Sequence, residues 1–153
     1  MTVMTLVIAV IVFVVTACCR PAIPTAHFAH LPQSGWLSTM PLSFAPEYVD
    51  STLTYDLSLA VRHSNSYHYR NLSLVVDVIA ADTTVNRKVL DISLADEYGS
   101  WSSGGFGALY QAVVPLVSDV APDDAHRVVV WQAMAGCDTL FEVVDVGIIV
   151  TPL

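Results

Sequence analysis

Residues 55–61, YDLSLAV, decide the fold class of this chain. Apolar side chains occupy every second position, and smaller or polar residues stand between them. Successive side chains of a β-strand point to opposite faces of a sheet, so this spacing predicts a strand with one face in a core and the other toward water. A 3.6-residue repeat that would favour a helix is absent from the stretch.

The same alternation returns at five later places, in residues 72–78, 90–94, 109–116, 128–134 and 143–150. Several of these runs are rich in valine, whose branched Cβ suits a pleated surface. Clusters of Asn, Asp, Gly, Pro and Ser separate them and favour turns. Many short strands between turn signals predict an all-β fold, a single antiparallel β-sandwich of jelly-roll or immunoglobulin-like type.

The N-terminus carries a secretion signal. Its first nineteen residues have no charged side chain and lead into Val15-Thr16-Ala17-Cys18, which fits a bacterial lipobox. The apolar run, residues 3–15, is shorter than the roughly 20 residues that cross a bilayer. We therefore predict a lipoprotein signal peptide over residues 1–17 and attachment of a diacylglycerol, with palmitate-type chains, to Cys18. The alternative is a short uncleaved signal anchor with acylated cysteines, since no Lys or Arg precedes the apolar run.

Residues 18–38 contain three prolines and few charges, so we predict a lipidated tether there. Residues 39–153 then form one β-sandwich domain. The net charge of −8, from fourteen acidic and six basic residues, argues against nucleic acid as a partner. Of the two remaining cysteines, Cys19 and Cys137, a disulfide is one possibility and a free buried Cys137 is the other.

Two turn segments hold most of the residues that could recognise a partner. Residues 62–71, RHSNSYHYRN, could form a recognition loop, or their tyrosines could cover the end of the sandwich with hydroxyls in water. Residues 98–107, YGSWSSGGFG, could hold a ligand against Trp101 and Phe106, or form a bent hairpin in which Trp101 plugs the core edge. The candidate partner-binding residues are Arg62, His63, Tyr67, Tyr69, Asn71 and Trp101.

The sequence offers no convincing catalytic or metal-binding set. Its five histidines, His27, His30, His63, His68 and His126, have no Cys or paired carboxylate at ligand spacing. Adjacent acids such as Asp96-Glu97 are ordinary turn residues. Because no nucleophile, base and orienting group can be assembled, we predict no catalytic residue, no metal, no cofactor and no enzymatic activity.

Short motifs occur in order along nearly the whole mature chain. They are Trp36, Phe44, Asp50, Arg62-His63, Tyr67 to Leu72, Gly99-Ser100-Trp101 with Gly104, Tyr110, Gln132-Ala133-Met134, Asp138 with Leu140, and Val144-Asp145-Val146-Gly147. Together with the lipobox, this order resembles the GldH family of gliding-motility lipoproteins of Bacteroidota outer membranes. Relatives often carry Arg after the Gln-x-Met motif, whereas Ala135 stands there in this chain, so no role of that arginine carries over.

The resemblance implies a non-enzymatic outer-membrane lipoprotein of the gliding-motility and type IX secretion machinery, which works with other envelope lipoproteins. Because Cys19 and then residues 20–23, RPAI, follow the lipobox where an acidic surface-export stretch would stand, we expect the domain to face the periplasm. We hypothesise an adaptor whose lipid raises the effective concentration of weak contacts. The competing hypothesis is a glycan-binding sandwich, in which Tyr67, Tyr69 and Trp101 stack on sugars and which fails if those side chains point inward.

Overall fold

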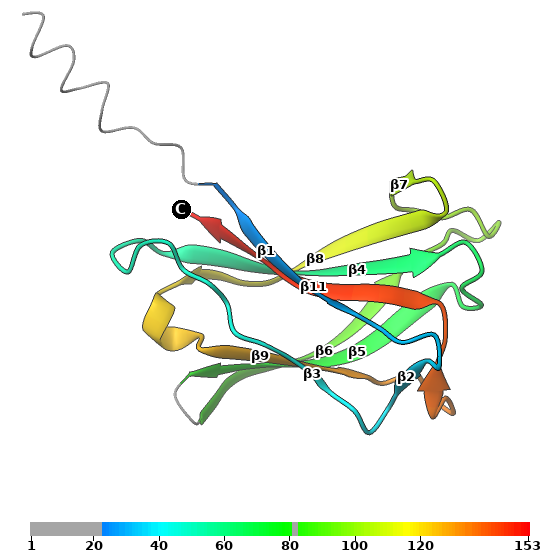
Figure 1. Cartoon of the computed structure of the whole chain (residues 1–153), viewed down its shortest axis with the longest axis horizontal. Coiled ribbons are helices and arrows are strands. Elements are labelled where there is room, and N and C mark those ends of the chain that lie inside the picture. The colour runs from blue at the N-terminus through cyan, green and yellow to red at the C-terminus, as the bar shows by residue number, and fades with distance from the viewer. Residues whose placement is uncertain (1–22, 81–82) are drawn as a thin grey trace, which may run out of the picture.

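Two β-sheets packed face to face make up the domain (Figure 1). The computed structural model describes residues 23–80 and 83–153, so the predicted signal peptide and Cys18 lie outside the described residues. Strands dominate the described part of the chain, and its one helical element is a short 3₁₀ turn, η1 (Pro122–Asp124). The predicted all-β sandwich with antiparallel sheets is confirmed. No helix within the described ranges is both long and apolar enough to cross a membrane.

The first sheet has five strands, and every pairing in it is antiparallel. Its order is β1 (Thr25–His30), β11 (Val143–Pro152), β4 (Tyr55–Ser64), β8 (Leu109–Val120) and β7 (Gly105–Phe106). On β4 the apolar positions that predicted the strand, Tyr55, Leu57, Leu59 and Val61, are each 0–1% exposed. Their burial explains the alternation, because these side chains face the second sheet and their neighbours face outward.

The second sheet has four strands, ordered β3 (Leu42–Phe44), β9 (Arg127–Gln132), β5 (Asn71–Ala80) and β6 (Thr83–Ser93). A separate two-stranded ribbon pairs β2 (Trp36–Leu37) with β10 (Thr139–Leu140). The facing sides of the sheets enclose the core, where Leu72, Leu74 and Val76 of β5 meet Ile148 of β11 and Leu59 of β4. All six predicted strands are present.

The predicted tether over residues 18–38 is wrong for its second half. Strand β1 lies inside it and pairs with β11 along its whole length, from Thr25 opposite Val150 to His30 opposite Asp145. Trp36 of β2 is 2% exposed and its indole nitrogen donates to the Met40 carbonyl over 2.8 Å. The backbone groups of β11 need a partner on this side, and β1 supplies it. The folded domain therefore begins at Thr25.

The sandwich has two ends, which lie at the left and right of Figure 1. The anchor end carries Thr25, where the described chain enters the sheet, and the C-terminal Leu153. The loop end carries the turns that follow β4 and precede β5, β8 and β11. Ten-residue strands such as β4 separate the two ends by about 33 Å. A lipid joined ahead of Thr25 would therefore hold the anchor end near the membrane.

Candidate interaction surface at the loop end

A buried aromatic cluster surrounds His63 at the loop end. The His63 side chain follows Val61 on the inner face of β4 and is fully buried. Its ring stacks on Tyr110, with centroids 5.6 Å apart and planes 18° apart, and lies 4.5 Å from Trp101 and 5.4 Å from Tyr67. His63 is thus the centre of a packed group that closes the sandwich between β4 and β8.

The environment of His63 keeps its imidazole neutral. Burial lowers the pKa of His63, although a hydrogen bond with the Ser64 carbonyl, 3.0 Å from Nδ1, acts in the opposite direction. A carbonyl only accepts, so Nδ1 carries the proton and Nε2 does not. Nε2 is buried and has no hydrogen-bond partner among the described residues. His63 is therefore a packing residue, and the prediction that it contacts a partner is wrong because no partner can reach it.

Tyr67 is also buried, whereas Tyr69 is not. The Tyr67 side chain is 4% exposed and its hydroxyl donates to the Asn71 carbonyl over 3.0 Å. Burial raises the pKa of that hydroxyl. The expectation that both tyrosines hold their hydroxyls in water is wrong for Tyr67, which cannot bind a partner directly. Tyr69 packs edge-on against Tyr67 at 5.7 Å and remains 42% exposed.

Trp101 closes the edge of the core. This agrees with the interpretation of residues 98–107 as a bent hairpin. Its backbone forms an isolated bridge with Ala95, and its indole nitrogen donates to Asn65 Oδ1 over 2.9 Å. The turn before it is built by Asp96, whose Oδ1 accepts from the amides of Tyr98 and Ser100 at 2.9 and 2.8 Å. The carboxylate of Asp96 is therefore a turn-forming group.

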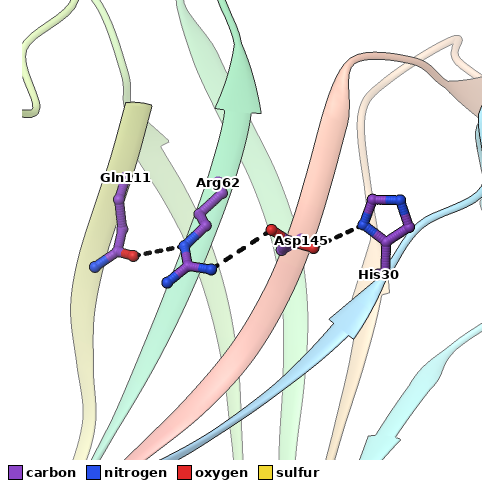
Figure 2. A network of polar contacts seen from close by, with 4 residues as sticks. All are labelled: His30, Arg62, Gln111 and Asp145. Atoms are coloured by element: carbon purple, nitrogen blue, oxygen red, sulfur yellow. Dashed lines mark hydrogen bonds and ion pairs between the residues drawn. The ribbon is translucent and has the colours of Figure 1, made fainter. Parts of the chain in front are cut away.

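Arg62 points the opposite way to His63, onto the outer face of the five-stranded sheet. Figure 2 shows the polar network around it, which crosses four strands. Arg62 Nε donates to Gln111 Oε1 over 2.8 Å, and Nη1 lies 3.6 Å from Asp145 Oδ2. Asp145 Oδ1 is 2.9 Å from Nδ1 of His30. These contacts link β8, β4, β11 and β1, so Arg62 ties the sheet together and is only partly available to a partner.

An open cleft of about 470 Å³ lies beside this network. Arg62 and Gln111 form its polar side, and Phe106 and Leu109 contribute its apolar side. Asn71, the remaining predicted residue, lies on the outer face of the other sheet, where Nδ2 donates to Asp91 Oδ1 over 2.6 Å. The six predicted residues therefore do not form one surface.

Four exposed aromatic side chains stand in turns or short strands at the loop end, and only Tyr69 was among the predicted site residues. Phe106 is 95% exposed, Tyr98 85% and Phe141 51%. We call these three and Tyr69 the loop-end aromatics. The signal that could have found them is their position, since each stands in a turn or at a strand end where no neighbouring strand can cover it. Exposed Leu37, Met40 and Leu109 extend the same end.

Within residues 23–80 and 83–153, no three His, Cys, Asp or Glu side chains lie close enough together to hold a metal ion. Cys137 is half-buried and forms no disulfide with another described residue, and its sulfur lies 3.1 Å from the Thr139 carbonyl oxygen. Pairing with Cys19 stays a prediction, because Cys19 lies outside the described residues.

The sequence pattern that defines the GldH lipoprotein family matches residues 25–150, a range that runs from the first residue of β1 to within two residues of the end of β11. The chain belongs to the GldH lipoprotein family. A gliding motility lipoprotein GldH homolog of Christiangramia forsetii is 28% identical over 120 residues, covering 73% of this chain and 74% of the relative. The gliding motility lipoprotein GldH of Flavobacterium johnsoniae is 25% identical over 120 residues, covering 74% and 76%. The resemblance to GldH is confirmed, and with it a membrane-anchored gliding-motility lipoprotein.

Solved structures add little to this assignment. The Tobacco streak virus coat protein shares 10% identity and covers 88% of this chain and 90% of its own, with a TM-score of 0.34. A likeness of that size supports no conclusion about function. Several GldH motif residues instead have a direct structural explanation. Trp36 pairs with Leu140 across the small ribbon, and Gln132 orders the turn after β9 by bonding the Cys137 carbonyl and the Met134 amide.

Proposed function

We propose that this GldH lipoprotein is a non-enzymatic adaptor of the gliding-motility and type IX secretion machinery. In this proposal, Cys18 carries the lipid, the anchor end lies near the outer membrane on its periplasmic side, and the loop end binds another envelope protein. The observation that carries the proposal is the exposure of all four loop-end aromatics at one end of the sandwich, about 33 Å from the anchor end.

Exposed aromatic side chains favour a protein partner. Aromatic residues are enriched in the cores of protein interfaces, where they bury a large area at a small cost in side-chain entropy. Phe106 and Leu109 also border the open cleft beside Arg62, so an apolar anchor of a partner would meet a polar group at the edge of the contact. Confinement to a membrane would raise the effective concentration of both proteins, and a modest contact would then suffice.

The glycan-binding alternative required Tyr67, Tyr69 and Trp101 to stack on sugars, and two of these side chains are not available for stacking. Tyr67 is 4% exposed, so its ring cannot stack on a sugar. Trp101 packs against His63 and Tyr110 and helps to close the core. Of the three proposed stacking side chains, only Tyr69 is exposed. A shared concave aromatic platform, which sugar binding needs, is therefore not formed by these three residues.

The test is a crosslinked pull-down of the tagged full chain from native membranes, followed by identification of the captured proteins. The test variant replaces Tyr98, Phe106 and Phe141 with Ser. Because all three side chains are exposed, the substitutions should leave the thermal unfolding temperature unchanged. The matched control is Val49→Ser, which removes a side chain that is 65% exposed and lies next to Asp50, close to the anchor end. A Cys18→Ala chain tests the role of the lipid.

The proposal expects envelope lipoproteins to be captured by the unchanged chain and by V49S, and to be lost with the triple variant and with C18A. Capture that is equal for the triple variant and V49S would show that the loop end is not the binding surface. Retention of polysaccharide in place of proteins would overturn the adaptor in favour of a glycan-binding lipoprotein.

A further inference from the structure

Strand β6 is an open edge of the four-stranded sheet. Among the strands of residues 23–80 and 83–153, it pairs with β5 on one side only. The other long edge, on β8, contains Pro115, which cannot donate to an added strand, and β3 has only three residues. Over residues 87–93, β6 has neither proline nor glycine. Exposed edges of this kind readily pair with another strand.

The outward side chains of this edge form a symmetrical row. Arg87, Val89 and Asp91 share the outer face, where they stand opposite Asp77, Val75 and Ser73 of β5. Val89 at the centre is 76% exposed. A cation and an anion thus lie two residues on either side of an exposed apolar residue, so the row has opposite charges at its two ends.

Both charged residues keep hydrogen-bonding capacity. Arg87 donates from Nε and Nη2 to the two carboxylate oxygens of Asp77, each over 2.6 Å. Asp91 accepts at Oδ1 from Asn71 Nδ2 and Ser73 Oγ, at 2.6 and 2.9 Å. These contacts hold the side chains in place, while Arg87 Nη1 and Asp91 Oδ2 have no partner within the described part of the chain.

We propose that β6 pairs with β6 of a second copy of this chain, antiparallel and centred on Val89. In that register each Arg87 stands directly opposite the partner's Asp91, so the pairing forms two cross-strand ion pairs around a central Val89 contact. Directly opposed side chains in an antiparallel pair have Cβ atoms about 5 Å apart, close enough for these contacts. The arrangement is a two-fold symmetrical, self-complementary interface, the commonest kind in homodimers.

An apolar row would extend across the joined sheets. Trp131 of β9, Val75 of β5 and Val89 stand side by side on the outer face, in register. In the dimer, this row would continue into the same three residues of the second copy. Lys88 would not obstruct the pairing, because its side chain points to the opposite face of β6 and its ammonium donates to the Leu116 carbonyl on β8.

The dimer is compatible with attachment of both copies to one membrane. Antiparallel pairing places the two Thr25 residues toward opposite ends of the joined molecule and at the same height above the sheet. Both lipids reach one bilayer when the eight-stranded sheet lies parallel to it. The loop ends then face along the membrane, where other anchored proteins lie.

The first test measures the mass of the full-length protein in detergent by analytical ultracentrifugation. Val89→Asp places two carboxylates opposite each other and should weaken the dimer at least about tenfold in Kd. Val89→Thr keeps the shape and the strand preference of the side chain, and should stay dimeric. Circular dichroism checks that both variants are folded, as expected for a side chain that is 76% exposed. A wild-type monomer at all concentrations, or a dimer that survives V89D, would overturn the proposal.

The second test fixes the register in native membranes. Val89 is the position that faces itself in this dimer, so V89C chains should form a disulfide-linked dimer under mild oxidation. Ser93 lies on the same face of the same strand but faces position 85 of the partner, so S93C is the matched control. Strong crosslinking of V89C with little of S93C supports the pairing. Equal crosslinking of the two, or none of V89C, contradicts it.

Discussion

The Arg62 guanidinium lies 3.9 Å from the centre of the Phe28 ring on the outer face of the five-stranded sheet. At that distance, the cation is attracted to the face of the ring. Phe28 stands opposite Gly147, and Gly147 stands opposite Ala60, so the ring lies over two positions with little or no side chain. Ala60 is fully buried although it faces away from the core. The sheet therefore has a second, small packed layer on its outer side.

This layer predicts that Gly147→Ala destabilises the domain. A Cβ at residue 147 would lie 2.5 Å from Phe28 Cδ1 and 2.6 Å from the His27 carbonyl oxygen. The backbone of β1 would have to move, so we expect the free energy of unfolding to fall by about 1–3 kcal/mol in urea denaturation. Gly104→Ala is the control, because a Cβ there meets no atom within 4 Å. Equal stability of the two variants would contradict the packing described here.

The two neighbouring tyrosines of the loop end should respond differently to substitution. Tyr67→Ala removes a buried ring, and we expect the unfolding free energy to fall by about 3–5 kcal/mol. Tyr69→Ala removes a ring that is 42% exposed, so its effect on stability should be much smaller. Thermal unfolding of both variants measures the difference. If Tyr67→Ala were as stable as the unchanged chain, the buried position of Tyr67 would be wrong.

The fold class could be predicted from the sequence because each long strand has one apolar face that is buried in the core. Strand β1 could not, because its sequence, TAHFAH, lacks that signature. Its inward positions include Thr25 and His27, which lie at the sheet edge where burial is incomplete, while Phe28 packs on the outer face. The alternation of side chains along a strand would, however, have predicted the buried position of His63. Val61 points into the core, so the residue two positions later must do so as well.

Most of the site could not be predicted, because it depends on strand register. Arg62, Gln111, Asp145 and His30 come from four strands and from distant parts of the sequence. A shift of one residue in any pairing would move these side chains to the other face. The exposure of Phe141 likewise depends on where the turn between β10 and β11 lies in space.

The boundary of the folded domain can be tested by deletion. Removal of residues 20–24 leaves every described strand intact, and we expect unchanged thermal unfolding. Removal of residues 20–30 deletes β1, which strips the edge of β11 and uncovers Gly147 and Ala60. The shorter chain should then unfold at a clearly lower temperature or fail to fold. Equal unfolding temperatures for the two deletions would contradict a domain boundary at Thr25 and would support a tether that extends to residue 38.

The buried His63 should make stability depend on pH. Burial holds the pKa of the folded group below its ordinary value of 6.5. In the unfolded chain, His63 titrates near 6.5, so below that pH the unfolded state binds the proton more readily than the folded state. The contribution of His63 is fully present above pH 6.5 and is lost as the pH falls toward the folded pKa. The unfolding free energy should therefore fall with decreasing pH, by up to about 1.4 kcal/mol per pH unit from this group.

Urea denaturation between pH 7.5 and 5 measures this slope. His63→Phe retains an aromatic ring among Tyr67, Trp101 and Tyr110 but cannot bind a proton, so the slope should become shallower in this variant even if its stability at pH 7.5 differs. His68→Phe is the matched control, because it replaces an exposed histidine of the same turn with the same residue. A slope that is the same in H63F and in the unchanged chain would show that His63 is not held neutral by the fold.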